Sequence, residues 1–89
     1  MVYYVYVLEC EGDKSLYIGF TRDLRQRYKD HREGKGGSAT KRKHDRRLIY
    51  FEGYSDKADA IGREKFLKSG SGRRYIRKQL FHYFEKGHE

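Results

Sequence analysis

The sequence YIGFTRDLRQRYKDH, residues Tyr17–His31, constrains the fold more than any other stretch of the chain. It opens with an apolar run of strand length, and Thr21 or Asp23 then supplies an N-cap for a helix. That helix should run to about Glu33, with Gly34 as its stop. A strand must therefore turn almost directly into a helix at this point of the chain.

The predicted helix carries cations close to the face that should meet the core. At about 100° per residue, Leu24 and Tyr28 form an inward stripe. Arg27 and His31 lie on the flank of that stripe, where charged or polar groups are costly unless they are paired or face a cleft. The alternative is that Arg27 extends outward to solvent and His31 caps the helix end. Spacing alone leaves both interpretations open.

The remaining segments predict one small α+β domain. An apolar run from Met1 to Cys10 and a second at Ser15–Phe20 flank a polar turn, which is the pattern of an antiparallel hairpin. A third run, Arg47–Tyr54, is again rich in β-branched and aromatic residues. The expected order is β-β-α-β-α-α, a three-stranded antiparallel β-sheet flanked by helices. The predicted strands are 1–10, 15–20 and 47–54, the predicted helices are 23–33, 57–69 and 73–84, and all belong to a single domain, 1–89, with a frayed tail at 85–89.

The composition favours a nucleic-acid partner. Lys and Arg number 21 against 13 Asp and Glu, and the resulting net charge of +8 on so small a domain indicates a phosphate polyanion. A membrane is the weaker interpretation, since no apolar run approaches the ~18 residues that span a bilayer. Cys10 is the only cysteine, which excludes an internal disulfide and a cysteine-based zinc site. No signal-peptide pattern precedes the first strand, so cytoplasmic residence is the expectation.

A carboxylate occupies the apolar face of the second predicted helix. Glu64 falls at the centre of the stripe that Ala60 and Leu67 define. One explanation is an ion pair with Arg27 or Lys68 that only stabilises the fold. The other is a metal site, because a single carboxylate suits a magnesium ion that keeps its waters and shares ligation with a substrate phosphate.

Two of the nine tyrosines, Tyr6 and Tyr17, are candidates for more than packing. Taken singly, each is most simply an aromatic core residue on a strand. Gly19 alters this interpretation, because a glycine inside a strand often marks the close approach of another group to the backbone. It also lies just before the helix that carries Arg27, so strand and helix could contribute to one site.

The ordered set of these residues resembles the GIY-YIG nuclease superfamily, and most closely its small stand-alone bacterial members. The resemblance rests on Tyr-Val-Tyr at 4–6, Tyr-Ile-Gly at 17–19, Arg27, His31, and Glu64 within Arg-Glu-Lys at 63–65, and it covers residues 3 to about 80. It implies the hydrolysis of a DNA phosphodiester that depends on one Mg²⁺ or Mn²⁺ ion.

The resemblance also implies roles for individual side chains. Glu64 would be the metal ligand, and Arg27 would stabilise charge on the scissile phosphate. Tyr6 would activate or orient the attacking water, with Tyr17 hydrogen-bonding near it. His31 is a second candidate for proton transfer, and the resemblance leaves open whether Tyr6 or His31 is the general base.

Basic residues of the middle loop and the last helix are candidates for phosphate contacts, which position DNA without reading its bases. They are Lys35, Lys41, Arg42, Lys43, Arg46, Arg47, Arg73, Arg74, Arg77 and Lys78. No recognition helix or zinc finger is visible, so the expected specificity is low or directed by DNA structure. The sequence therefore predicts a Mg²⁺-dependent endonuclease for duplex or branched DNA, with RNA as the competing polymer and a protein partner as the source of any targeting. The alternatives are a non-catalytic nucleic-acid-binding module that uses the same basic surface, and a structural protein of a nucleoprotein assembly.

Overall fold

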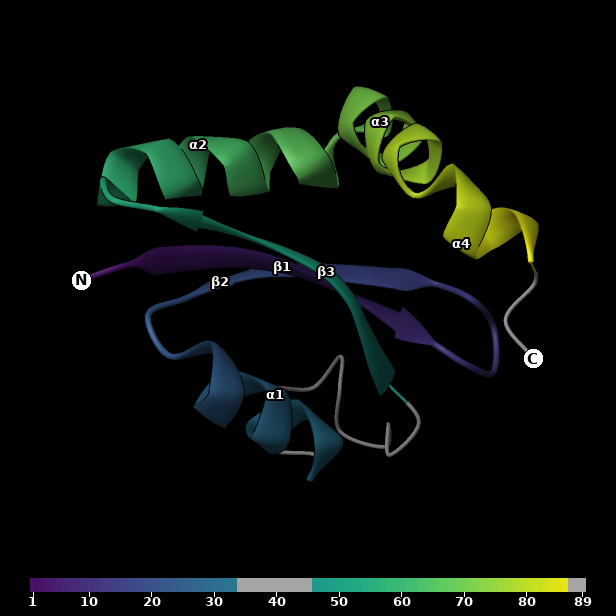
Figure 1. Cartoon of the computed structure of the whole chain (residues 1–89), viewed down its shortest axis with the longest axis horizontal. Coiled ribbons are helices and arrows are strands. Elements are labelled where there is room, and N and C mark those ends of the chain that lie inside the picture. The colour runs from purple at the N-terminus through teal and green to yellow at the C-terminus, as the bar shows by residue number, and fades with distance from the viewer. Residues whose placement is uncertain (34–45, 87–89) are drawn as a thin grey trace.

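A three-stranded antiparallel sheet forms the centre of the molecule, in the strand order β2-β1-β3. The computed structural model describes residues 1–33 and 46–86. Within them, β1 is Tyr3–Cys10, β2 is Leu16–Thr21 and β3 is Arg46–Tyr54. The central strand β1 is buried from Val5 to Cys10, as its largely apolar and aromatic sequence predicts. The sheet and its flanking helices confirm the predicted fold class (Figure 1).

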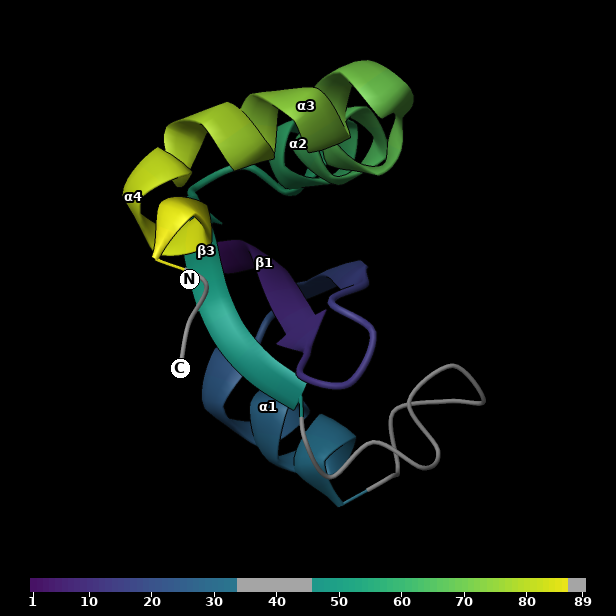
Figure 2. The same cartoon turned by 90° about the vertical axis from the view of Figure 1, so that its right-hand side faces the viewer.

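Helices of the described residues cover both faces of the sheet. Helix α1, Leu24–Arg32, lies on one side, whereas α2, Lys57–Lys68, α3, Gly70–Gln79, and α4, Phe81–Glu85, lie on the other (Figures 1 and 2). None of the helices in residues 1–33 and 46–86 is long and apolar enough to cross a membrane.

The hydrophobic core lies between the sheet and helices α2 and α3. Alternation along β1 directs Val5 and Val7 to this side, where they pack with Ala60, Leu67 and Ile76. The backbones of the two helices meet closely at Gly72, where a Cβ would lie 1.8 Å from the carbonyl oxygen of Phe66. The same alternation directs the even-numbered tyrosines of β1, Tyr4 and Tyr6, toward α1.

Capping side chains fix where the helices begin. Asp23 is the N-cap of α1, since its carboxylate accepts a hydrogen bond from the amide of Gln26 at 3.1 Å. Thr21, the other candidate from the sequence, remains in β2. Asp56 caps α2 in the same way and accepts from the amide of Ala58 at 2.8 Å.

The last predicted helix differs from the observed structure at both ends. It was expected at 73–84, but α3 begins at Gly70, because the Ser69 hydroxyl caps it by accepting from the amide of Gly72 at 3.1 Å. The chain then turns at Leu80, with φ −104° and ψ 37°, and α4 follows as a separate short helix. The turn allows the Tyr83 hydroxyl to donate to the carboxylate of Glu9 at 2.5 Å, which ties α4 to the end of β1.

Candidate functional site

Three of the predicted site residues meet in one cluster on the α1 side of the sheet. The hydroxyl of Tyr6 lies 3.0 Å from Nε2 of His31. The ring of Tyr17 packs against the His31 imidazole with centroids 4.8 Å apart, and against the Tyr6 ring at 6.3 Å. Tyr6 is only 2% exposed and His31 is fully buried, so the two polar groups are held in a largely apolar setting. His31 therefore does not merely cap the helix end.

Gly19 makes this cluster sterically feasible. Register places Tyr6 of β1 directly opposite Gly19 of β2. A Cβ at position 19 would lie 2.3 Å from the hydroxyl oxygen of Tyr6, so the phenol ring occupies the space that a side chain would need. Because β2 is an edge strand, the ring reaches across it toward the border of the sheet. The predicted close approach at this glycine is present.

The surroundings of the cluster favour the uncharged forms of Tyr6 and His31. Burial raises the pKa of Tyr6, with further raising by Tyr17 and Glu64, while Arg27 acts in the opposite direction. The pKa of His31 is lowered from 6.5 to about 4, chiefly by burial and then by the positive charges of Arg27 and Arg46. At neutral pH the pair is therefore a phenol and an uncharged imidazole.

The hydrogen bonding of His31 has two possible proton arrangements. The Tyr6 hydroxyl donates to Nε2 when the imidazole proton is on Nδ1, and Nε2 donates to the phenol oxygen in the other tautomer. Among the described residues, Nδ1 has no hydrogen-bond partner in either case. A buried nitrogen without a hydrogen bond lowers the stability of the fold. Such an unsatisfied group is one of the signs of a catalytic position.

Glu64 belongs to α2, and its charge acts on the same phenol. Helix α2 contacts both β1 and β2, and the charge of Glu64 is one of those that raise the pKa of Tyr6. Its side chain is 20% exposed and lies 3.0 Å from the ammonium group of Lys68. The ion pair with Lys68 that the sequence suggested as a purely structural explanation is thus present.

The predicted phosphate-contacting residues lie in different settings. Lys78 is exposed on α3, and Arg47 lies 2.6 Å from the carboxylate of Glu11. Arg74 and Arg77 are exposed on α3, where they border a groove with Tyr75 and Phe81. Arg73 is partly buried and donates to the backbone of β2. Lys35, Lys41, Arg42 and Lys43 lie outside the described residues.

Arg46 differs from the expectation of an exposed loop cation. It begins β3 and is only 5% exposed, because its guanidinium lies over the ring of Tyr17 at 5.4 Å. Its backbone carbonyl accepts from the Tyr28 hydroxyl at 3.4 Å. Arg46 therefore borders the Tyr6–Tyr17–His31 cluster, where its charge acts on His31, and is not available on the surface for DNA.

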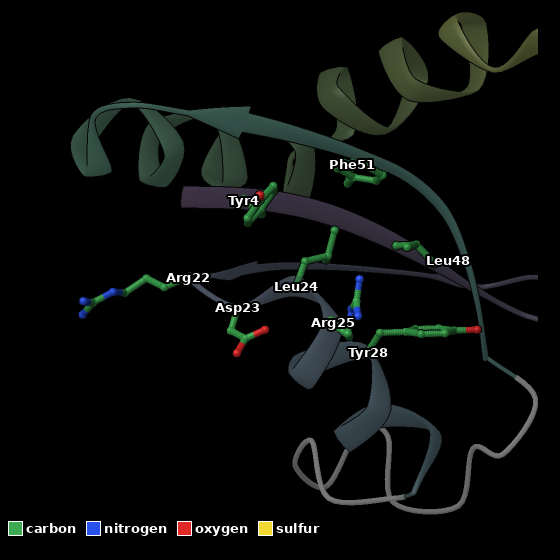
Figure 3. A pocket seen from close by; sticks show the side chains of 8 residues that line it. All are labelled: Tyr4, Arg22, Asp23, Leu24, Arg25, Tyr28, Leu48 and Phe51. Atoms are coloured by element: carbon green, nitrogen blue, oxygen red, sulfur yellow. The ribbon is translucent and has the colours of Figure 1, made fainter. Parts of the chain in front are cut away.

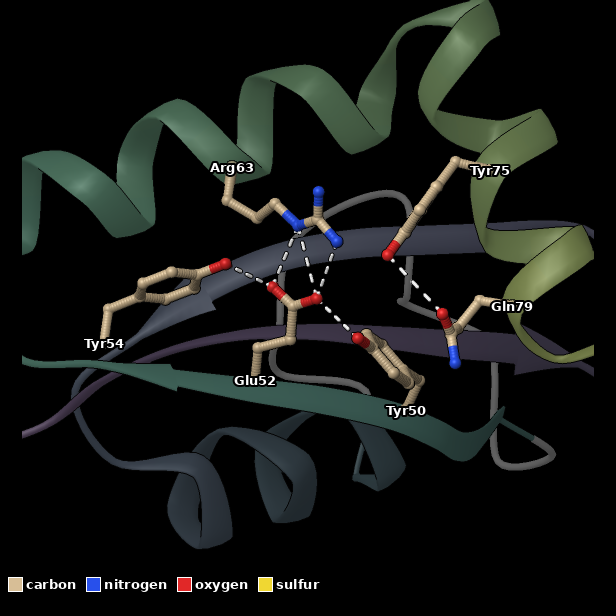
Figure 4. A network of polar contacts seen from close by, with 6 residues as sticks. All are labelled: Tyr50, Glu52, Tyr54, Arg63, Tyr75 and Gln79. Atoms are coloured by element: carbon tan, nitrogen blue, oxygen red, sulfur yellow. Dashed lines mark hydrogen bonds and ion pairs between the residues drawn. The ribbon is translucent and has the colours of Figure 1, made fainter.

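Sequence reasoning missed a polar network on the opposite face of the sheet (Figure 4). Glu52 of β3 accepts from the hydroxyls of Tyr50 at 2.5 Å and Tyr54 at 2.6 Å, and from the guanidinium of Arg63 at 2.9 Å. Arg63 in turn lies over the ring of Tyr75, 4.7 Å from its centroid. The available signal was the Tyr-x-Glu-x-Tyr alternation, which sets three hydrogen-bonding groups on one face of a strand.

Comparison with known proteins adds an independent line of evidence. A family model described as the GIY-YIG catalytic domain matches residues 2–78. A UPF0213 protein of Streptococcus pneumoniae serotype 4 is 45% identical over 65 residues, which are 73% of this chain and 65% of that protein, just under two thirds of its length. A UPF0213 protein of Haloquadratum walsbyi is 37% identical over 67 residues, or 75% of this chain and 74% of that protein.

A solved structure supports the same grouping. The solution NMR structure of a UPF0213 protein from Bacillus halodurans shares 33% identity and a TM-score of 0.57, covering 90% of this chain and 86% of the other. The family model and the solved structure each match most of the chain. The chain belongs to the GIY-YIG family of nuclease domains, with UPF0213 proteins among its relatives.

Proposed function

We propose that this protein is a Mg²⁺-dependent DNA endonuclease with low or structure-directed specificity. The observation that carries the proposal is the hydrogen-bonded pair of Tyr6 and His31, 3.0 Å apart, whose pKa values respond to the charges around them. Arg27 acts on both members of the pair, and Glu64 acts on Tyr6. One phenol is thereby within the influence of a cation suited to phosphate and a carboxylate suited to a metal.

The donor set fits one kind of metal site. Among the described residues there is no group of three or more His, Cys, Asp and Glu side chains that could hold an ion. Glu64 stands as a lone carboxylate, which suits a Mg²⁺ that keeps several waters and takes other ligands from a phosphate. When bound, the ion would supply Lewis-acid stabilisation of charge on the phosphate oxygens. Mn²⁺, with its similar preference for oxygen ligands, would serve in its place.

The proton path uses the chain's own residues. In the tautomer with the His31 proton on Nδ1, Tyr6 takes a proton from the attacking water as it passes its own to Nε2 of His31. The new bond forms from the water oxygen to phosphorus, the bond from phosphorus to the leaving sugar oxygen breaks, and that oxygen takes a proton from solvent. Such proton transfer by a positioned side chain contributes roughly 10²–10⁴-fold to a rate.

Substrate binding would itself prepare His31 for this step. In the protein without DNA, burial and the two nearby arginines hold the pKa of His31 at about 4, too low for an effective base. A phosphate beside Arg27 would offset that positive charge and so raise the pKa. Arg27 would then have two effects, since it also stabilises the additional negative charge of the transition state.

The test is the nicking of supercoiled plasmid and the cutting of branched DNA, each with Mg²⁺ or with EDTA. Tyr6→Phe, Arg27→Met and Glu64→Gln should each reduce the Mg²⁺-dependent rate by about 100-fold or more. Lys65→Met is the matched control, because Lys65 is an exposed neighbour of Glu64 on the same helix. A wild type that binds DNA but cuts no faster than Glu64→Gln would favour the non-catalytic binding module. Metal-dependent cutting that survives all three substitutions would overturn the site assignment.

A further inference from the structure

A pocket of about 500 Å³ lies beside the candidate site, on the α1 side of the sheet. The strands contribute Tyr4, Leu48 and Phe51 to it, and Leu24 reaches it from α1 (Figure 3). Its size is within the roughly 300–1,000 Å³ that small-molecule and cofactor sites occupy. None of its lining residues belongs to the Tyr6–Tyr17–His31 cluster.

Strand register sets the pocket next to Tyr6. Phe51 of β3 is the direct partner of Tyr6 of β1, on the side away from Gly19. Tyr4 shares a face with Tyr6 two residues earlier on the same strand, about 7 Å along it. The rings of Tyr4 and Phe51 meet edge to face with centroids 6.1 Å apart. Two aromatic rings therefore lie on the sheet surface beside Tyr6, the proposed reacting group: Phe51 on the neighbouring strand and Tyr4 two residues earlier on the same strand.

The residues that line this pocket suit a ligand better than a simple gap in the packing would. Phe51 is 52% exposed, which is unusual for a ring on a sheet face that a helix partly covers. Leu24 and Leu48 give the pocket apolar walls, while the exposed side chains of Arg22, which precedes α1, and of Arg25 on α1 also line it. Asp23 also borders it, but its carboxylate is engaged in capping α1. Flat apolar surfaces bordered by guanidinium groups match a nucleobase and the phosphate attached to it.

We propose that this pocket binds an unpaired nucleobase of the nucleic acid, close to the bond to be cut. The proposal deepens the proposed function, on which its biological meaning rests, by naming the substrate class: DNA in which at least one nucleotide next to the cut is unpaired. A paired base presents only its edges, so it offers no face to Phe51, whereas a bulged, flapped or single-stranded base does. Structure-directed specificity would then originate in Phe51 and Tyr4.

Binding is measured in EDTA, so that the result does not depend on cleavage. The probes are three labelled DNA hairpins, each closed by a linker that carries no bases, at one salt concentration: fully paired, with one bulged thymidine, and with an abasic residue at the bulge. The wild type should bind the thymidine bulge about fivefold or more tightly than either of the others, as base–aromatic stacking predicts. Phe51→Leu, which keeps an apolar side chain and removes the ring, should bind all three alike. Phe51→Trp should restore the preference.

Phe66→Leu is the matched control, since Phe66 is 38% exposed and belongs to α2, which lies on the other side of the sheet. It should keep the preference for the thymidine bulge. The proposal is overturned if the wild type binds the three hairpins equally, or if Phe51→Leu retains the preference. Ribonucleotide versions of the hairpins identify the polymer: tighter RNA binding with the same dependence on Phe51 supports the pocket and assigns RNA to it. A preference for the unpaired base without plasmid nicking would support the base-binding pocket and contradict the endonuclease proposal. Nicking without that preference would support the endonuclease proposal and contradict the base-binding pocket.

Discussion

Gly19 of β2 leaves open the space that the ring of Tyr6 fills, since a Cβ at position 19 would lie 2.3 Å from its hydroxyl oxygen and 2.4 Å from Cζ. The two residues are register partners in the sheet. The phenol can therefore lie flat across the edge strand and meet His31, which the following helix holds above it. A larger residue at 19 would displace the phenol from its hydrogen bond.

Gly19→Ala should therefore reduce catalysis more than it reduces stability. The methyl group would force the buried Tyr6 ring to move, which costs about 1–3 kcal/mol in overpacking. Loss of the positioned phenol should lower the nicking rate by about 100-fold. The comparison is Gly62→Ala, in the interior of α2, where an added Cβ meets nothing within 4 Å. That substitution should stabilise the protein by up to about 1 kcal/mol and leave the nicking rate unchanged. Full activity in Gly19→Ala would contradict the assigned role of Tyr6.

The sequence predicted this part of the site well because its signals are local. Strand alternation, a glycine within a strand and a helix that follows at once fix which side chains share a face. It could not predict the depth of burial of His31, since spacing set it only on the flank of the helix. Nor could it foresee that Arg46 would turn inward over Tyr17, because a cation's direction depends on the tertiary surface that it meets.

The buried imidazole of His31 should make folding stability depend on pH. Its pKa is about 4 in the folded protein against 6.5 for an ordinary histidine, chiefly because of burial and secondarily because of Arg27 and Arg46, which Asp30 partly offsets. Between these values the unfolded chain binds more protons than the folded one, so the free energy of unfolding rises with pH from 4 to 6.5. The contribution is fully present above pH 6.5, and roughly 3 kcal/mol of it should be lost toward pH 4.

Urea denaturation from pH 4 to 7.5 measures this slope. His31→Gln should flatten it, whereas His82→Gln, which alters an exposed histidine, should leave it as in the wild type. Carboxylates also titrate near pH 4, so the informative quantity is the difference between each variant and the wild type. An unchanged slope in His31→Gln would mean that His31 is not buried in its neutral form.

The network around Glu52 should contribute more to stability than a surface ion pair of similar geometry. Burial alone would raise the pKa of Glu52, but hydrogen bonds from Arg63, Tyr50 and Tyr54 hold it below 4.5, so the carboxylate is charged and paired at neutral pH. Glu52→Gln should cost about 1–3 kcal/mol in chemical denaturation at pH 7. The protection is lost as the pH falls through the folded pKa, so the difference between variant and wild type should shrink in acid.

An exposed ion pair provides the comparison for Glu52. Glu11 lies 2.6 Å from Arg47, closer than Glu52 is to Arg63, but its side chain is 48% exposed against 15% for Glu52. Glu11→Gln should therefore cost less than about 1 kcal/mol. Equal losses in the two variants would show that burial does not strengthen the Glu52 network. This ranking could not be made from the sequence, where both carboxylates are simply acidic residues of strand or turn segments.

Lys68 should compete with the metal for Glu64. The two side chains lie 3.0 Å apart, and Lys68 is 52% exposed. An exposed ion pair of this kind is weak, so a metal ion could displace Lys68 from the carboxylate. Lys68→Met removes the positive charge that competes with the metal ion for the Glu64 carboxylate. The Mg²⁺ concentration for half-maximal nicking should therefore fall, by up to about fivefold for an interaction of at most about 1 kcal/mol.

Lys65→Met, one turn earlier and also exposed, controls for the general loss of positive charge on α2. Since DNA affinity also depends on that charge, the Mg²⁺ titration is made at saturating DNA. An unchanged or higher Mg²⁺ requirement in Lys68→Met would indicate that Glu64 is not the residue that meets the ion.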